Sequence, residues 1–338
     1  MHSAGCPHEG SRIPETQSSW ASVCSDAGEL PTPGRRQLPP YTFPGLPHEF
    51  AAYVTEPLVQ RPAGSIGKSG SCSLAFAVDH ARTFLHSSFV THPFHLTRPW
   101  YSDPALPGMA VVYVQTPAGG LIQGDRVHLH FGLDAKAQVH VTTQAAEKIH
   151  SMTANCALQH VSFVIGAGAY AEYCPEPVLL FSGARFGQEM NIELGEGASF
   201  FFTEIFLSHS ATNSSSFAAL STSLTVKDAA GQLCLRDRSL ALPTQQCLDG
   251  PGVLGSYRVW GQALMLSPSM SPAWAREIHT LIAAVPQVIC GVTTLPGKHG
   301  IGIKVVASEV RLVRRVLTIA WDYLRTRCIG APAPVFPK

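Results

Sequence analysis

The sequence predicts a mainly β protein, in which a layered, barrel or solenoid body of many short strands is followed by about two helices. Between about residue 70 and residue 265, apolar and polar residues alternate in short runs that Gly, Pro, Asp and Ser separate. Such an alternation places successive side chains on opposite faces of a strand. The 338 residues are 45% hydrophobic and only 14% charged, so a large part of the chain can be buried.

Four runs show this alternation most clearly. Their apolar residues are Val127, Leu129 and Phe131; Val139 and Val141; Val161, Phe163 and Ile165; and Met190, Ile192 and Leu194. Several strands at intervals of about ten residues are typical of an all-β body. We find no strict repeat of fixed length, so the residues alone do not predict a regular β-helix with a readable coil motif.

The N-terminal part differs from this body. Residues 1–64 are rich in Ser, Pro and Gly, and their apolar periodicity is weak. Such a composition is typical of irregular or extended chain. We therefore expect a disordered extension over 1–64, followed by one β-rich domain over 65–338.

Two helices are predicted near the C-terminal end. Residues 273–285 form a short helical pattern that ends before Pro286. In residues 309–326, apolar residues recur at helical spacing after Ser308, which is a suitable N-cap. Gly330 is expected to end this second helix.

Composition argues against several classes of function. The formal charge is +1, and there is no basic stripe or zinc-finger spacing, so nucleic acid is not an expected partner. The nine cysteines are scattered and never form a CxxC pair, which is typical of free thiols in a reducing compartment. There is no secretory signal pattern and no run of about 18 apolar residues. The sequence therefore predicts a cytoplasmic protein without a membrane partner.

The loop from Thr116 to Asp125 is the most distinctive segment. Its glycines invite comparison with a phosphate-binding loop, but such a loop carries a Lys followed by Ser or Thr and leads into a helix. Here the loop has no such Lys and leads into an alternating strand. It therefore predicts a tight turn that needs glycine. Neither GxSxG nor HExxH occurs, so no familiar catalytic motif is present.

Two histidines suggest a metal site. His128 and His130 lie on one face of a predicted strand, and they could share an ion if a neighbouring strand supplied a third ligand. No Cys or carboxylate stands at a compelling spacing beside them. A polar strand face in contact with solvent is the alternative, and the sequence favours it.

Two carboxylates are more informative. Strict alternation places Glu204 on the face of Phe202 and Phe206, and it places Asp237 on the face of Leu233 and Leu235. A charged carboxylate on an apolar face is costly unless it is paired, hydrogen-bonded, hydrated or metal-bound. Each acid is therefore either paired with an arginine or with backbone N–H groups, or it lines a wet internal passage that a divalent ion could use.

The segment TPAGGLIQGD at 116–125, followed by VHVTTQAAEKIH at 139–150, resembles the signature of the UreD (UreH) family of urease accessory proteins. Similarity continues in order at 172–177, at 181–184, at 235–238 and near Trp321. The residues that match the signature are Gly119, Gly120, Gly124, Asp125, Thr142, Thr143, Gln144, Ala145, Lys148, Glu172 and Pro175.

This resemblance implies a stacked, β-helix-like scaffold with two helices and no reaction of its own. It also implies partners: UreF, through it the GTPase UreG, and the subunits of apo-urease, into which nickel is inserted. Glu204 and Asp237 stand where the family has acids, so they would line a passage for Ni²⁺ in transit. Carboxylate oxygens are acceptable transient ligands for Ni²⁺, and no permanently bound cofactor is implied.

Two other classes of function remain open at this point. A β-solenoid carbohydrate-active enzyme would place paired acids in an open groove lined by aromatic residues. A stand-alone metal-binding protein would hold its ion on the strand of His128 and His130.

Overall fold

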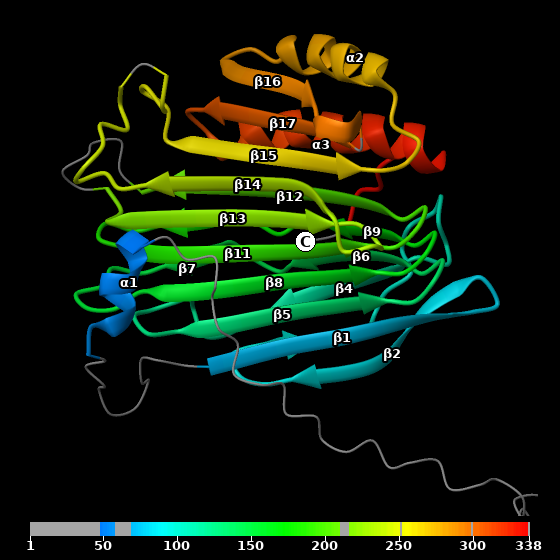
Figure 1. Ribbon diagram of the computed structural model, residues 1–338, viewed down its shortest axis with the longest axis horizontal. Coiled ribbons are helices and arrows are strands. Elements are labelled where there is room, and N and C mark those ends of the chain that lie inside the picture. Colours follow the sequence, from blue (N-terminus) through cyan, green and yellow to red (C-terminus); the bar gives the residue numbers. More distant parts are fainter. Residues whose placement is uncertain (1–47, 58–68, 210–215, 251, 299, 337–338) are drawn as a thin grey trace, which may run out of the picture. The chain divides into compact units, whose positions relative to one another are not determined.

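The computed structural model describes residues 48–57, 69–209, 216–250, 252–298 and 300–336. The strands of this part form two sheets that face each other, and the chain passes repeatedly from one sheet to the other (Figure 1). The coils stack about four turns deep in the manner of a β-solenoid. The predicted mainly β, stacked fold is therefore confirmed.

The first sheet consists of β1 (Ser69–Asp79), β2 (Arg82–Val90), β5 (Arg126–Leu133), β8 (Ala157–Ile165), β11 (Arg185–Leu194), β13 (Ala219–Lys227) and β14 (Leu233–Ala241). Its order is β14-β13-β11-β8-β5-β1-β2. The strands from β1 to β13 along this path are parallel, whereas β14 and β2 close the two edges in antiparallel orientation.

The second sheet consists of β3 (His95–Leu96), β4 (Ala110–Gln115), β6 (Gln138–Thr143), β7 (Glu147–Ile149), β9 (Tyr170–Tyr173), β10 (Val178–Leu180), β12 (Ser199–Ser208), β15 (Val259–Leu266), β16 (Val288–Thr294) and β17 (Gly300–Ala307). Its main path is β16-β17-β15-β12-β9-β6-β4-β3, and β10 joins β12 to β7. From β12 to β16 the pairing is antiparallel, so the coil ends there.

Three stacked turns join the first sheet to the second. They are residues 134–137, 166–169 and 195–198, and the last residue of each is a buried alanine. A Cβ on Gly195 would lie 2.7 Å from the carbonyl oxygen of Ile165, so glycine is needed for the turns to stack this closely. The turns begin 32 and then 29 residues apart. The repeat therefore has a variable length, which is why no strict period shows in the sequence.

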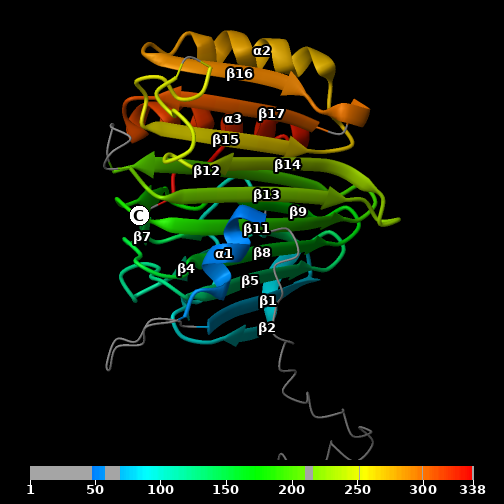
Figure 2. The same ribbon diagram turned by 60° about the vertical axis from the view of Figure 1, so that its left-hand side comes forward.

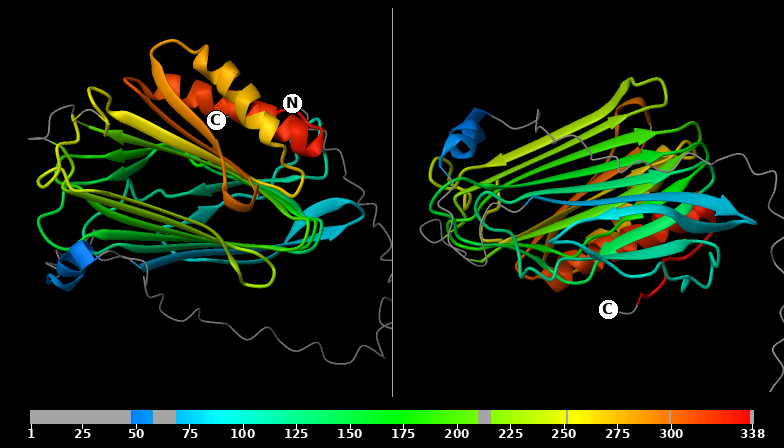
Figure 3. Two further views of the ribbon diagram at one scale, coloured as in Figure 1. Left: turned by 45° about the horizontal axis from the view of Figure 1, so that its top comes forward. Right: turned by 90° about the horizontal axis from the view of Figure 1, so that it is seen from below.

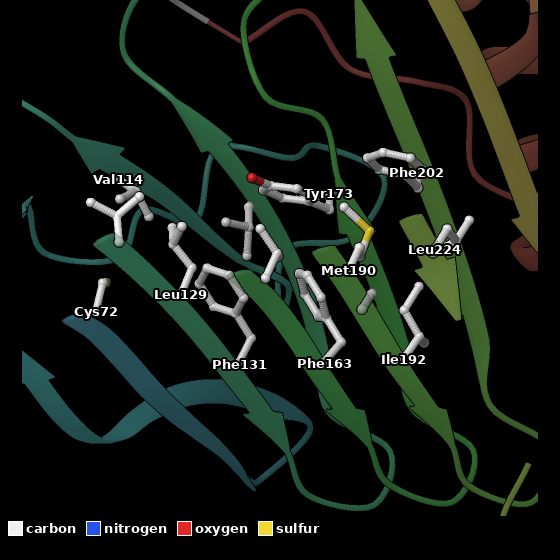
Figure 4. Packing of buried hydrophobic residues seen from close by; sticks show 14 of the residues in the cluster. Cys72, Val114, Leu129, Phe131, Phe163, Tyr173, Met190, Ile192, Phe202 and Leu224 are labelled. Carbon is white, nitrogen blue, oxygen red and sulfur yellow. The ribbon is translucent and has the colours of Figure 1, made fainter. Parts of the chain in front are cut away.

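Apolar and aromatic side chains fill the space between the sheets (Figure 4). Phe163 stacks on Phe131, with ring centroids 4.7 Å apart, and its ring lies 5.0 Å from that of Phe200. All three rings are fully buried. Burying one such side chain contributes about 1.5–3 kcal/mol, so this stack is a main source of the stability of the coils.

Two helices, α2 (Pro272–Ala283) and α3 (Val310–Ile329), cover the outer face of the second sheet near β15 and β17 (Figure 3). Both were predicted, with small differences at their ends. The hydroxyl of Ser271 caps α2, and Glu309 rather than Ser308 stands at the N-cap of α3. Gly330, with φ of 70°, ends α3 as expected. Within the described residues, no helix combines the length and apolar character needed to cross a membrane.

A third helix, α1 (His48–Thr55), lies on the outer face of the first sheet (Figure 2). Phe50 is fully buried there beside Leu158, and Glu56 forms an ion pair of 2.8 Å with Arg185. The prediction of disorder over 1–64 is therefore wrong for this short segment, because one aromatic ring and one ion pair anchor it. Residues 1–47 and 58–64 lie outside the described part of the chain.

Candidate functional site

A row of polar side chains crosses the otherwise apolar space between the sheets. In the second sheet, Glu204 on β12 is the register partner of Gln262 on β15, and Gln262 is the partner of Lys304 on β17. The residues next to them in sequence pack under the helices, so these three side chains face the first sheet. We call them, together with the facing residues Gln188, Thr222, Asp237 and Ser239 of the first sheet, the polar belt.

Two cavities lie on opposite sides of this belt. The larger one, of about 900 Å³, is bounded by 304–306 of β17 and by 239–241 of β14. The smaller one, of about 440 Å³, is bounded by 302–304 of β17 and by 235–237 of β14. Gln262 and Lys304 line both cavities, so the belt forms the boundary between them.

Glu204 is the innermost acid of the belt and is only 4% exposed. Both of its hydrogen-bond donors are neutral amides: Gln188, and Gln262 at 3.0 Å from Oε2. Burial raises the pKa of Glu204 to about 7; the negative charge of Asp237 adds to this, while the two amides and Lys304 oppose it. At neutral pH the Glu204 carboxyl is therefore close to the midpoint of its titration.

Asp237 lies nearer to solvent, and its carboxylate Oδ2 is 3.0 Å from Nζ of Lys304. Its side chain is 34% exposed and that of Lys304 is 66% exposed. The expected apolar face around Asp237 holds for Leu235, which lines the same cavity, but not for Leu233. A β-bulge beside Val226 turns Leu233 to the outer face, where it is 54% exposed.

The two predicted histidines lie on the outer face of the first sheet, apart from both cavities. His128 stacks on His160, with ring centroids 4.7 Å apart, and Nδ1 of His130 is 2.8 Å from the hydroxyl of Ser162. Burial, and then the charge of His130, lowers the pKa of His128 to about 4. Nowhere in the described chain do three or more His, Cys, Asp or Glu side chains gather in a way that could hold a metal ion.

The residues of the signature at 116–150 make mostly backbone contacts. Gly119, Gly120 and Gly124 all have positive φ, and a Cβ on Gly120 would lie 2.3 Å from the carbonyl oxygen of Lys148. Asp125 is fully buried and accepts a hydrogen bond of 3.0 Å from the Ile122 amide. The loop is thus a tight turn held against β7.

The rest of the signature ties neighbouring coils together. The hydroxyl of Thr143 accepts a hydrogen bond of 2.9 Å from the Glu176 amide, and the Gln144 amide donates to the Val114 carbonyl at 3.3 Å. Pro175 lines a small pocket between β6, β9 and α3. None of the signature residues lines either cavity beside the belt.

A second polar group lies on the helix-covered side of the second sheet, around Glu172 of β9. We call it the Glu172 cluster; its members are Asp103, His140, Tyr170, Glu172, Trp321 and Arg325. Nδ1 of His140 is 2.6 Å from Glu172 Oε2, and Nε of Arg325 is 3.1 Å from Oε1 as an ion pair. Burial acts to raise the pKa of Glu172, but the hydrogen bond and charge of His140, with Arg325 and Tyr170, lower it overall.

Gln188, Gln262 and Lys304 were not predicted from the sequence. A signal for the two glutamines was present, because each interrupts an apolar face of its own strand, between Phe186 and Met190 in one case and between Trp260 and Leu264 in the other. That is the same signal that drew attention to Glu204. Lys304 likewise interrupts an apolar face of its own strand, β17.

Comparison with known proteins gives one consistent result. The family model described as "UreD urease accessory protein" matches residues 68–337. A "Urease accessory protein UreD" of Haloarcula marismortui is 30% identical over 291 residues, which cover 85% of this chain and 97% of that protein. Proteins of the same name from Photorhabdus laumondii (32% identity over 85% of this chain and 90% of that protein) and Cenarchaeum symbiosum (30% over 82% and 99%) are similar too.

Proposed function

Since the chain belongs to the family of UreD urease accessory proteins, with a role in urease maturation, we propose that it is a scaffold that assists nickel insertion into apo-urease. It works in the cytoplasm with UreF and, through UreF, with the GTPase UreG, and it catalyses no reaction of its own. The observation that carries this proposal is the family match, which extends over 270 residues from 68 to 337.

The polar belt supports a passage for Ni²⁺ through the protein. Glu204 and Asp237 both belong to the belt, and the two cavities beside it extend the space between the sheets. Within the described part of the chain, buried Glu204 is bonded to two amides and is not in direct contact with a cationic side chain. A hydrated cation could therefore bind its carboxylate without displacing another positive charge. Oxygen ligands bind Ni²⁺ less tightly than thiolates, which suits an ion that must be handed on.

Co-expression tests the maturation role. The urease subunits, UreF and UreG are produced with and without this chain, and urease activity and bound nickel are measured. We expect both to depend on the chain. Equal activity and nickel content in its absence would contradict the proposal.

The double variant Glu204→Ala, Asp237→Ala tests the passage. We expect it to co-purify with UreF as the parent does but to yield nickel-poor urease. The matched control is Glu193→Ala, which removes an exposed acid from the outer face of the first sheet and should leave nickel loading unchanged. Normal nickel content in the double variant would exclude these two acids from the passage.

The two rival functions find less support in this geometry. The carbohydrate-active enzyme requires two accessible acids, but Glu204 is buried and Asp237 is paired with Lys304. The stand-alone metal-binding protein requires ligands that converge, whereas His128 and His130 engage in ring stacking and in a hydrogen bond to Ser162.

A further inference from the structure

The Lys304–Asp237 ion pair spans the gap between the two sheets. Lys304 belongs to β17 of the second sheet, and Asp237 belongs to β14, the edge strand of the first sheet. Since Lys304 lines both cavities and Asp237 lines the smaller one, the pair lies at the boundary between the two. A direct path from one cavity to the other along Gln262 and Lys304 runs beside this ion pair.

The Lys304 ammonium occupies the place that a metal cation would take beside Asp237. Its charge neutralises Asp237 at 3.0 Å, and it is close enough to Glu204 to lower the pKa of that carboxyl as well. A divalent cation that approached the two acids would meet a like charge at short range. The ammonium and the metal ion therefore compete for the same carboxylates.

The Lys304 side chain has room to leave this position. Its register partner on β16 is Gly291, and a Cβ placed on Gly291 would meet nothing within 4 Å. The side chain is 66% exposed, and a lysine stem has several rotatable bonds. The ammonium can therefore swing over Gly291 towards solvent without a change in the backbone.

We infer that Lys304 is a latch in the passage: its ammonium stands in for the metal beside Asp237 at rest and must swing away before Ni²⁺ can pass between Asp237 and Glu204. The latch rests on the proposed function, because it assigns a residue to the same passage. It keeps Asp237 neutralised while no metal is being delivered.

Equilibrium dialysis of the purified full-length chain against NiCl₂ at neutral pH tests the latch directly. Lys304→Met keeps most of the length of the side chain and removes its charge, and Lys304→Gln is a second neutral variant. We expect the apparent Kd for Ni²⁺ to fall by about tenfold or more in both, because the competing charge is gone. Neutral variants that bind Ni²⁺ no more tightly than the parent would overturn the inference.

Two controls show whether the gain comes from this position. Lys304→Arg keeps the charge, and Lys227→Met removes a charge from the outer face of the first sheet, so both should bind Ni²⁺ as the parent does. In the double variant Lys304→Met, Asp237→Asn the gain should disappear, because the released carboxylate is missing. A gain that persists there would place the ion elsewhere and would contradict the latch.

Failure of the latch and failure of the proposed function give different results. Dialysis measures Ni²⁺ binding without urease, so it tests the role of Lys304 independently of urease maturation. If urease matures without this chain, the proposed function fails whatever the dialysis shows. If urease requires the chain but Lys304→Met binds Ni²⁺ as the parent does, only the latch fails.

Discussion

Glu172 and Glu204 are two glutamates of the same sheet, both buried, in opposite surroundings. Glu172 lies on the side of the helices, ion-paired with Arg325 and bonded to His140, and its pKa is lowered. Glu204 lies between the sheets and is bonded to two amides, and burial raises its pKa to about 7. Similar burial therefore accompanies pKa shifts in opposite directions, and the charge of the neighbouring groups decides the direction of the shift.

The difference distinguishes a structural acid, whose charge stabilises the fold, from an acid that can still bind a cation. The carboxylate of Glu172 is already neutralised by groups from β6 and α3, so it holds α3 onto the second sheet. Among the described residues no cation is in direct contact with the carboxyl of Glu204, so binding of one would still lower the free energy. Substitution of one acid at a time tests whether the two carboxyl groups differ in this way.

The largest effect is expected from Glu172→Gln. Removing the charge leaves Arg325 buried beside Asp103 with one anion fewer, and breaking such a buried pair costs about 3–5 kcal/mol. The free energy of unfolding, measured by guanidinium denaturation at pH 7, should fall by that amount. A loss below about 1 kcal/mol would show that Glu172 is not a structural acid.

The same variant has a predicted pH dependence. Because the pKa of Glu172 is lower in the folded state, its contribution is fully present above its ordinary pKa and is lost as the pH falls through the folded value. The difference in the free energy of unfolding between parent and variant should therefore become smaller towards acid pH. A gap that widened on acidification would contradict the assignment.

Glu204→Gln is expected to have a smaller effect of the opposite sign. A folded pKa of about 7 against a usual value of 4.5 means that ionised Glu204 destabilises the folded state. The cost is absent below about pH 4.5, grows as the pH rises and is complete above about pH 7, where it reaches about 1–3 kcal/mol. The variant should thus be more stable than the parent at pH 8.

Parallel denaturation curves from pH 5 to pH 8 measure this effect. The free energies of unfolding of the two proteins should diverge as the pH rises, with the higher value for the variant. A variant that is less stable than the parent at pH 8 would mean that Glu204 has a charged partner in solution, and the contrast with Glu172 would disappear.

The smallest effect is expected from Asp237→Asn. The ion pair with Lys304 is partly exposed, and such pairs contribute about 0–1 kcal/mol. The free energy of unfolding should change by less than about 1 kcal/mol, and the difference should shrink further in 0.5 M NaCl because salt screens exposed charges. A loss of about 3 kcal/mol or more would assign Asp237 to the structural acids instead.

The local parts of this contrast were predictable from sequence. An alternation of period two is a property of a single strand, so the face of Glu204 could be read from its neighbours in the chain. The identity of its partners could not, because Gln262 is 58 residues away and meets Glu204 only through the register of β12 and β15. A search for polar interruptions in every apolar face would have found the two glutamines but not their pairing.

Other details depended on features that have little signal in sequence. The β-bulge that turns Leu233 outward inserts one residue into a strand that otherwise alternates, and no Gly or Pro marks it. Helix α1 is only eight residues long, and its stability comes from the burial of Phe50 rather than from its own periodicity. The two longer helices were predictable because their apolar residues recur over several turns.

Strand β14, which carries Asp237, pairs with β13 alone among the described strands, whereas β17, which carries Lys304, pairs with both β15 and β16. Backbone amides exchange with deuterium through local openings, and strands bound along one edge open at a lower free energy than strands bound along two. The amides of β14 should therefore exchange before those of β17. Backbone fluctuations that widen the gap between the sheets thus begin on the side of Asp237, while β17 stays in place.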